Sequence, residues 1–349
     1  MSPFTVVLIV PTGIGAAIGG YAGDALPVAR AIAQISDRLI THPNVLNGAQ
    51  LYWSAENIYY VEGYGLDRFA AQQWGLQPVR QNKIGLLLDR GIEPELRLRQ
   101  IQAADATRAT LGLNLTDYVV TDAPLNVELR TAESGASWGT IGNPGSLLRA
   151  ADKLIQQAGA KAIAVVARFP DDEDSVALQN YRQGAGVDSL AGAEAVISHL
   201  IVRQFQIPAA HAPALMPLAV DPKVSPRAAA EELGYTFLPC VLVGLARAPQ
   251  FVTTQNLTSA NTIWSDSVDV AIVPYTACGG SAILSFGGAA TEIIAVTNNS
   301  TQIDVPPEPL GIKVTAVNSY LEALGMLVTR RAGINSQVFY PDISSLRSI

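Results

Sequence analysis

The sequence is poor in charged residues and in cysteine, and it contains no long apolar run. Only 15% of the 349 residues are charged, and arginine outnumbers lysine by 18 to 5. No basic stripe interleaved with aromatic residues is present, so nucleic acid is not an expected partner. Two cysteines, Cys240 and Cys278, are too few for a disulfide scaffold or a cysteine-based zinc finger. Because no segment reaches about 18 uninterrupted apolar residues, we expect no membrane-spanning helix and no membrane partner.

The N-terminus lacks the features of a signal peptide. It has no basic region at its start, and Pro11 and Gly13 interrupt the apolar run. We therefore interpret residues 4–10 as a buried strand and expect a cytoplasmic protein. The composition, 49% hydrophobic with 29 glycines, fits an α/β protein with buried strands and tight loops.

Strand-like runs alternate with helical patterns along the chain. The expected strands span residues 4–10, 58–61, 84–89, 118–121, 162–167, 240–245, 268–273, 292–297 and 313–317. The expected helices span residues 23–39, 93–111, 146–158, 190–205, 226–234 and 318–332. This alternation predicts an α/β fold of two Rossmann-like halves, with largely parallel sheets and a crevice between them. We place the N-terminal half at residues 1–158 and the C-terminal half at residues 159–349.

A glycine-rich loop follows the first strand. Its candidate ligand-binding residues are Thr12, Gly13, Gly15, Gly19 and Gly20. A strand, a glycine loop and a helix in succession aim backbone N–H groups at an anionic ligand. The spacing departs from the dinucleotide-binding fingerprint, because the sixth position counted from Gly13 is Ile18, and there is no Walker motif. The loop either binds an anion or is a tight turn that needs glycine only for packing.

A second glycine-containing loop follows the expected strand at residues 268–273. Thr276, Gly279, Gly280 and Ser281 are candidate ligand-binding residues there. Cys278 is the candidate nucleophile or acid–base group, since a following helix would stabilise its thiolate. The alternative for Cys278 is a small buried residue in a tight turn.

Two of the three histidines lie close together in the sequence. His199 and His211, with Glu194 or Asp188 as a partner, are candidate acid–base catalysts. Their spacing matches no metal-binding motif, so we expect no metal site. The alternative is that both histidines are structural.

Two further places are candidates for the same crevice. Asn298 and Asn299 follow the expected strand at residues 292–297, and their amides suit polar ligand groups or a self-bonded turn. His42 follows the first expected helix and either lines the crevice or caps a turn.

The residues 19–25, 41–48 and 226–240 resemble a conserved cyanobacterial family of proteins without a known role, the domain of unknown function 3326 family. This resemblance covers nearly the whole chain. It implies a cytoplasmic protein of a photosynthetic microbe, and it implies no activity. A weaker resemblance links residues 13–20, 269–281 and 292–297 to sugar-nucleotide glycosyltransferases of the two-Rossmann type. Those enzymes carry a glutamate after the second glycine loop, and residues 282–286 contain none.

These observations favour a cofactor-independent enzyme of the isomerase, lyase or transferase type. Its expected substrate is a small anionic metabolite that carries a carboxylate or phosphate. The alternatives are a non-catalytic metabolite-binding protein, an oligomeric scaffold, or a sugar-nucleotide glycosyltransferase-like enzyme. Each of these hypotheses allows a homo-oligomer.

Overall fold

Two parallel β-sheets form the body of the protein. The computed structural model describes residues 2–48, 55–171, 175–232, 237–253, 261–343, 345 and 346. The larger sheet has the strand order β14-β13-β12-β1-β2-β3, and the smaller has the order β10-β9-β5-β6. All neighbouring strands within these two sheets are parallel. The α/β fold with largely parallel sheets is therefore confirmed.

The strands of the two sheets are short and mostly buried. The larger sheet contains β1 (Thr5–Leu8), β2 (Arg38–Thr41), β3 (Ile58–Tyr60), β12 (Val270–Pro274), β13 (Glu292–Val296) and β14 (Thr315–Val317). The smaller sheet contains β5 (Ile84–Leu88), β6 (Leu115–Val120), β9 (Ala162–Arg168) and β10 (Ala209–Ala214). Two antiparallel pairs lie outside them: β4 (Gly75–Gln77) with β11 (Gln250–Val252), and β7 (Val127–Thr131) with β8 (Ser137–Ile141).

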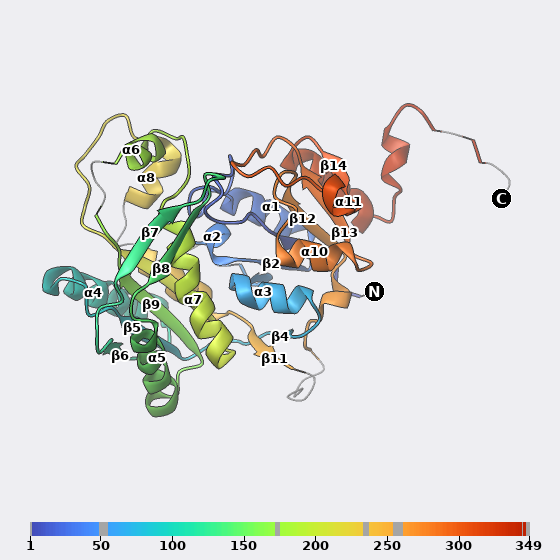
Figure 1. The fold of residues 1–349 in the computed structure, drawn as a ribbon. Coiled ribbons are helices and arrows are strands. Elements are labelled where there is room, and N and C mark those ends of the chain that lie inside the picture. The colour runs from blue at the N-terminus through green and yellow to red at the C-terminus, as the bar shows by residue number, and fades with distance from the viewer. Residues whose placement is uncertain are drawn as a thin grey trace.

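Helices cover both faces of each sheet (Figure 1). The helices are α1 (Leu26–Ile35), α2 (Pro43–Leu46), α3 (Gly63–Ala70), α4 (Pro94–Leu111), α5 (Pro144–Ala158), α6 (Val176–Arg182), α7 (Ala191–Phe205), α8 (Pro226–Glu232), α9 (Phe237–Ala246), α10 (Ser281–Gly287) and α11 (Tyr320–Arg331). Of these, α6 and α8 lie beside each other and away from the two sheets. No helix within the described ranges is long and apolar enough to cross a membrane.

Alternate residues of each strand pack against opposite helix layers. Val6 and Leu8 of β1 pack with α1 and α11, whereas Val7 packs with α3 and α10. In the smaller sheet, Leu87 packs with α5 and α7, and Leu86 packs with α4 and α9. Successive side chains of a strand point to opposite faces of the sheet. A strand that is buried on both faces therefore has a continuous apolar run in its sequence.

Each sheet combines strands from distant parts of the chain. In the larger sheet, Val6 of β1 pairs with Val270 of β12. In the smaller sheet, Ile84 of β5 pairs with Ala162 of β9. The expected boundary between residues 158 and 159 therefore does not separate the two sheets.

Two expected elements were wrong. Residues 240–245 were expected to form a strand, but they lie in α9, where Val241 and Leu242 are fully buried between α4 and the smaller sheet. A short apolar run that is buried on all sides has the same pattern in a strand and in a helix. The first helix was expected to reach Leu39, but α1 ends at Ile35 and Leu39 lies buried in β2. Strand β10 was not expected at all.

Candidate functional site

A cavity of about 340 Å³ opens at the carboxyl edge of the larger sheet. The segments that follow β1, β2, β3 and β12 line one side of it, and α7 and β10 line the other. Its polar and ionisable lining residues are Thr12, His42, Asn44, Asn47, Glu62, Asp67, Asp188, Glu194, Ser198, His199, His211 and Ser281. The carboxyl ends of parallel strands are where α/β proteins bind ligands.

Both glycine-containing loops contribute to this cavity. Pro11 and Thr12 come from the first loop, and Ala277, Gly280 and Ser281 come from the second. The two loops predicted from the sequence to share a crevice therefore face one cavity.

The glycines of the first loop have conformational and packing roles. Gly13, Gly15 and Gly19 have φ values of +72°, +60° and +90°, which disfavour any residue with a Cβ atom. A Cβ atom at Gly19 would also lie 2.5 Å from Cγ1 of Val10. At Gly20, a Cβ atom would collide with the backbone of the same loop. None of these four glycines is among the residues that line the cavity.

Asn299 holds the first loop from outside the cavity. It is buried, and its amide accepts a hydrogen bond from Ile18 N at 2.8 Å and donates to Ile18 O at 2.9 Å. It also donates to the hydroxyl of Tyr320 at 2.8 Å. Asn298 is exposed and bonds Asn318 through its backbone N–H. Asn299 therefore anchors the loop from behind, and neither Asn298 nor Asn299 lines the cavity.

The second loop is held by its own neighbours. Thr276 Oγ1 lies 2.7 Å from Thr301 Oγ1, and a Cβ atom at Gly279 would lie 2.8 Å from Val305. Cys278 is fully buried in the cluster of apolar residues that contains Phe286. Burial raises the pKa of its thiol to about 11, so the thiolate is disfavoured at neutral pH. Cys278 does not line the cavity.

Glu62 and His199 form an ion pair at the cavity wall. The Glu62 carboxylate also accepts the N–H groups of Tyr64 at 2.8 Å and Gly65 at 3.2 Å, which caps α3. Burial opposes the charged form of His199, but Glu62, together with the charge of Asp67 and the backbone of Ala195, outweighs burial and raises the pKa of His199. Burial also raises the pKa of the nearby Asp67.

A second carboxylate–histidine pair comes from α7 and β10. Glu194 Oε2 lies 3.7 Å from His211 Nε2, and Ser198 Oγ lies 3.0 Å from His211 Nδ1. Asp188 is buried just before α7 and accepts a hydrogen bond from Leu190 N at 2.8 Å. Burial, reinforced by the negative charge of Glu194, raises the pKa of Asp188 to about 7. The predicted candidates Glu194, His199 and His211 thus lie in one cavity.

The cavity lining is acidic. It includes four carboxyl groups and three histidines, and no lysine or arginine occurs among its lining residues within the described ranges. Across the same part of the chain, no three histidine, cysteine, aspartate or glutamate side chains are grouped so as to hold a metal ion.

Sequence reasoning missed Glu62, Asp67 and the two amides Asn44 and Asn47. Glu62 comes directly after the expected strand at residues 58–61, so the rule that ligands bind at strand ends would have found it. Asp67 lies on α3, which was not predicted.

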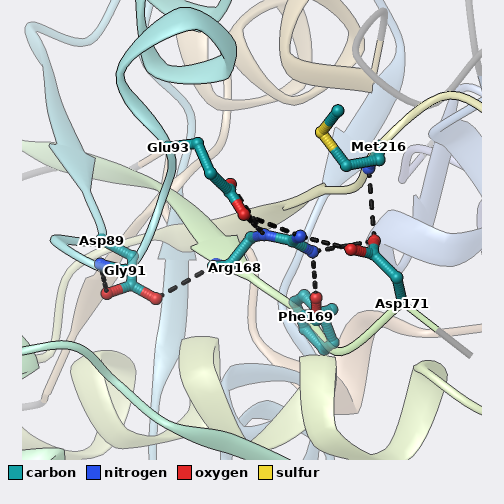
Figure 2. Close-up of polar contacts among 7 residues, drawn as sticks. All are labelled: Asp89, Gly91, Glu93, Arg168, Phe169, Asp171 and Met216. Carbon is teal, nitrogen blue, oxygen red and sulfur yellow. Dashed lines mark hydrogen bonds and ion pairs between the residues drawn. The ribbon is translucent and has the colours of Figure 1, made fainter.

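A network of charged residues fixes the carboxyl edge of the smaller sheet (Figure 2). Arg168, at the end of β9, pairs with Glu93 at 2.9 Å and also with Asp171. The guanidinium of Arg168 lowers the pKa of Asp171, whose carboxylate accepts the N–H of Met216 at 3.3 Å. Leu215, the neighbour of Met216, lines the cavity. The network therefore fixes the segment at Leu215 and Met216, which forms part of the cavity wall.

Asp89 supports the same edge and comes directly after β5. Its buried carboxylate accepts the backbone N–H groups of Gly91 and Leu125, each at 2.9 Å, and of Arg168 at 3.1 Å. Three accepted hydrogen bonds satisfy a carboxylate that burial would otherwise destabilise.

The fold and the cavity define an α/β protein with two parallel sheets and a ligand-sized cavity lined by histidines and carboxylates. The chain belongs to the family described as "Protein of unknown function (DUF3326)", whose model matches residues 5–340. A relative from Synechococcus sp., named an uncharacterized lipoprotein, is 61% identical over 338 residues, which cover 97% of this chain and 93% of the relative. No solved structure matches the chain. The resemblance to an uncharacterised cyanobacterial family is confirmed.

Proposed function

We propose that the protein is an enzyme that transfers protons on a small polar metabolite bound in the cavity, without a cofactor. One observation carries this proposal: two carboxylate–histidine pairs, Glu62–His199 and Glu194–His211, line the same cavity. A histidine whose pKa is raised is a ready proton donor near neutral pH, and a carboxylate beside a second histidine is a ready acceptor. Such a donor and acceptor on one substrate favour an isomerase or a lyase.

The lining favours a neutral or cationic metabolite over the anionic one that the glycine loops suggested. The lining holds four carboxyl groups and, within the described ranges, no lysine or arginine that could pair with an anion. For the same reason a nucleotide-sugar donor, with its two phosphates, is a poorer candidate than a small polyol, amine or carbonyl compound. A transferase mechanism through Cys278 is less favoured because its thiol is buried outside the cavity.

The experiment is a deuterium-exchange screen. The protein is incubated in D2O with pools of neutral, cationic and anionic metabolites, and proton NMR reports loss of C–H signal or conversion. We expect exchange in a neutral or cationic pool, and we expect Glu62→Gln and Glu194→Gln to reduce it by roughly 100-fold or more. Asp304→Asn, at an exposed position, is the matched control.

A thermal-shift screen of the same pools separates the alternatives. A ligand at 100 times its dissociation constant adds about 2.7 kcal/mol of stability. A compound that stabilises the protein but shows no exchange would favour the non-catalytic metabolite-binding protein. Stabilisation by anions alone would contradict the proposed substrate charge.

We also propose a cytoplasmic location and leave a homo-oligomer as a prediction. The Synechococcus relative is named a lipoprotein, which is a statement about that protein. Cell fractionation with an antibody to this chain tests the location, and recovery in the membrane fraction would contradict it. Light scattering of the purified protein tests the oligomeric state.

A further inference from the structure

His42 lies directly after β2, beside the end of β1, and is 8% exposed. The backbone N–H of Val10 donates a hydrogen bond to His42 Nε2 at 3.0 Å. An N–H group donates only to a nitrogen that carries a lone pair, so Nε2 is unprotonated. Burial lowers the pKa of His42 to about 4, which keeps the ring neutral at neutral pH. The one ring proton therefore sits on Nδ1.

The Nδ1–H group of His42 is open to the cavity. His42 precedes α2, but its side chain makes no capping hydrogen bond there. Across the described ranges, Val10 is the only hydrogen-bond partner of the ring. Within these ranges Nδ1 has no partner and is still not one of the fully buried polar atoms, so it is accessible. His42 lines the cavity. A nine-tenths buried side chain thus presents one unused donor, of fixed tautomer, to the space where a ligand would bind.

We propose that His42 Nδ1–H donates a hydrogen bond to the carbonyl oxygen of the substrate, which is a small neutral or cationic carbonyl compound. This inference rests on the proposed proton-transfer function and names its substrate class. A donor that stays neutral at neutral pH can bind a carbonyl oxygen and can hold it more strongly as negative charge develops on it. Because the backbone N–H of Val10 fixes the ring, His42 can donate this hydrogen bond without rearranging.

The proposed reaction uses only groups that line the cavity. The Glu194–His211 pair removes a proton from the carbon next to the carbonyl. The electrons of that C–H bond form a C=C bond, and the C=O π electrons move to the oxygen, which becomes an enolate held by His42. If the substrate has a hydroxyl on the carbon that lost the proton, that hydroxyl gives its proton to the enolate oxygen. The abstracted proton then returns to the former carbonyl carbon, and the new C=O bond forms at the former hydroxyl, which gives the isomer. If the substrate instead has a leaving group on the next carbon, the enolate re-forms its C=O bond, the C=C bond shifts by one carbon, and the leaving group departs with its bonding electrons and a proton from His199, which gives the lyase product. No oxidant or reductant is required.

The test is long-range proton–nitrogen NMR of protein labelled with 15N-histidine. The chain has three histidines, so His199→Gln and His211→Gln assign the signals by elimination. We expect His42 to be neutral and protonated on Nδ1 from about pH 5 to pH 8. Protonation on Nε2, or titration near the ordinary histidine pKa, would overturn the inference.

Dihydroxyacetone and glycerol then form a matched pair of probes, since they differ only in the carbonyl. We expect dihydroxyacetone to shift the His42 Nδ1–H signal and glycerol to leave it in place. Equal shifts, or none with either probe at saturating concentration, would overturn the carbonyl assignment. A shift without deuterium exchange would leave His42 as a carbonyl donor while the enzyme proposal fails, so the two failures are distinguishable.

Discussion

Glu62 and His199 join the two sheets across the cavity. Glu62 follows β3 of the larger sheet, and His199 lies on α7, which packs against the smaller sheet. Figure 1 shows α3, which begins after Glu62, and α7 between the two sheets. The ion pair is therefore at once a link between the layers and part of the cavity lining.

Replacing Glu62 by Gln should lower the pKa of His199, because the carboxylate that favours the imidazolium is lost. NMR titration of the histidine signals measures this. The pKa of His199 in the folded protein lies above its unfolded value of 6.5, so the pair stabilises the fold fully below that value. The stabilisation is lost as the pH rises through the folded pKa.

The matched control is Glu194→Gln, which removes a carboxylate beside the other histidine. It should leave the pKa of His199 in place. An unchanged pKa in Glu62→Gln would mean that the ion pair does not form in solution.

Replacing Asp188 by Asn should stabilise the protein at alkaline pH. Burial and the charge of Glu194 raise the pKa of Asp188 in the folded protein to about 7, above its ordinary value of 3.8, so ionisation costs more in the folded state. The free energy of unfolding should thus fall as the pH rises from about 4 to about 7 and level off above that. At pH 8 the variant should gain up to about 4 kcal/mol, because a pKa that folding raises from 3.8 to about 7 disfavours the folded carboxylate by about that much, and at pH 4 it should match the parent.

Urea unfolding at several pH values measures this difference. Asp304→Asn, at an exposed site, should change stability little at any pH. A variant that is less stable than the parent at pH 8 would show that the Asp188 carboxylate is needed in its charged form.

Cys278 should react with iodoacetamide more slowly than free cysteine at neutral pH. Its side chain is fully buried and its thiol pKa is raised to about 11, so both access and thiolate fraction are low. Mass spectrometry of tryptic peptides reports the modification of Cys278 separately from that of Cys240. Denatured protein, in which both thiols are free, is the reference. Rapid labelling of Cys278 in the folded protein would restore it as a candidate nucleophile.

Replacing Arg168 by Ala should destabilise the protein by roughly 1 to 2 kcal/mol, because two carboxylates lose their shared partner. The side chain of Arg168 is only 15% exposed, so water replaces these contacts poorly. Arg149→Ala is the control, since its pair with Asp122 is exposed on both sides and should contribute little. Equal effects of the two substitutions would contradict the role assigned to the network in Figure 2.

Strands buried on both faces were predictable because they are continuous apolar runs that include several valines, leucines or isoleucines. β1, β9 and β12 are of this kind. β10 was not, because its sequence of alanines, His211 and Pro213 has neither large side chains nor alternation. The error at α9 arose from the opposite case, a helix so completely buried that it shows no polar face.

The position of the cavity was predictable in part. The two glycine-containing loops marked the correct sheet edge, because a strand followed by a glycine turn is a local pattern. The partners Glu62 and His199 were not predictable as a pair, since they are far apart in sequence and meet only after α7 packs against α3, which Glu62 caps. The role of His42 depends on a backbone group of the neighbouring strand, which no sequence pattern records.

The position of β1 has a consequence for biosynthesis. β1 is hydrogen-bonded to β2 on one side and to β12 on the other, so its second edge is completed only by residues 270–272. During synthesis, one apolar edge of β1 stays unpaired until residues 270–272 have been made. Long-range parallel pairing of this kind is slow and exposes the nascent chain to aggregation. We therefore expect the protein to need chaperone protection on the ribosome, and fragments that end before β12 to be insoluble.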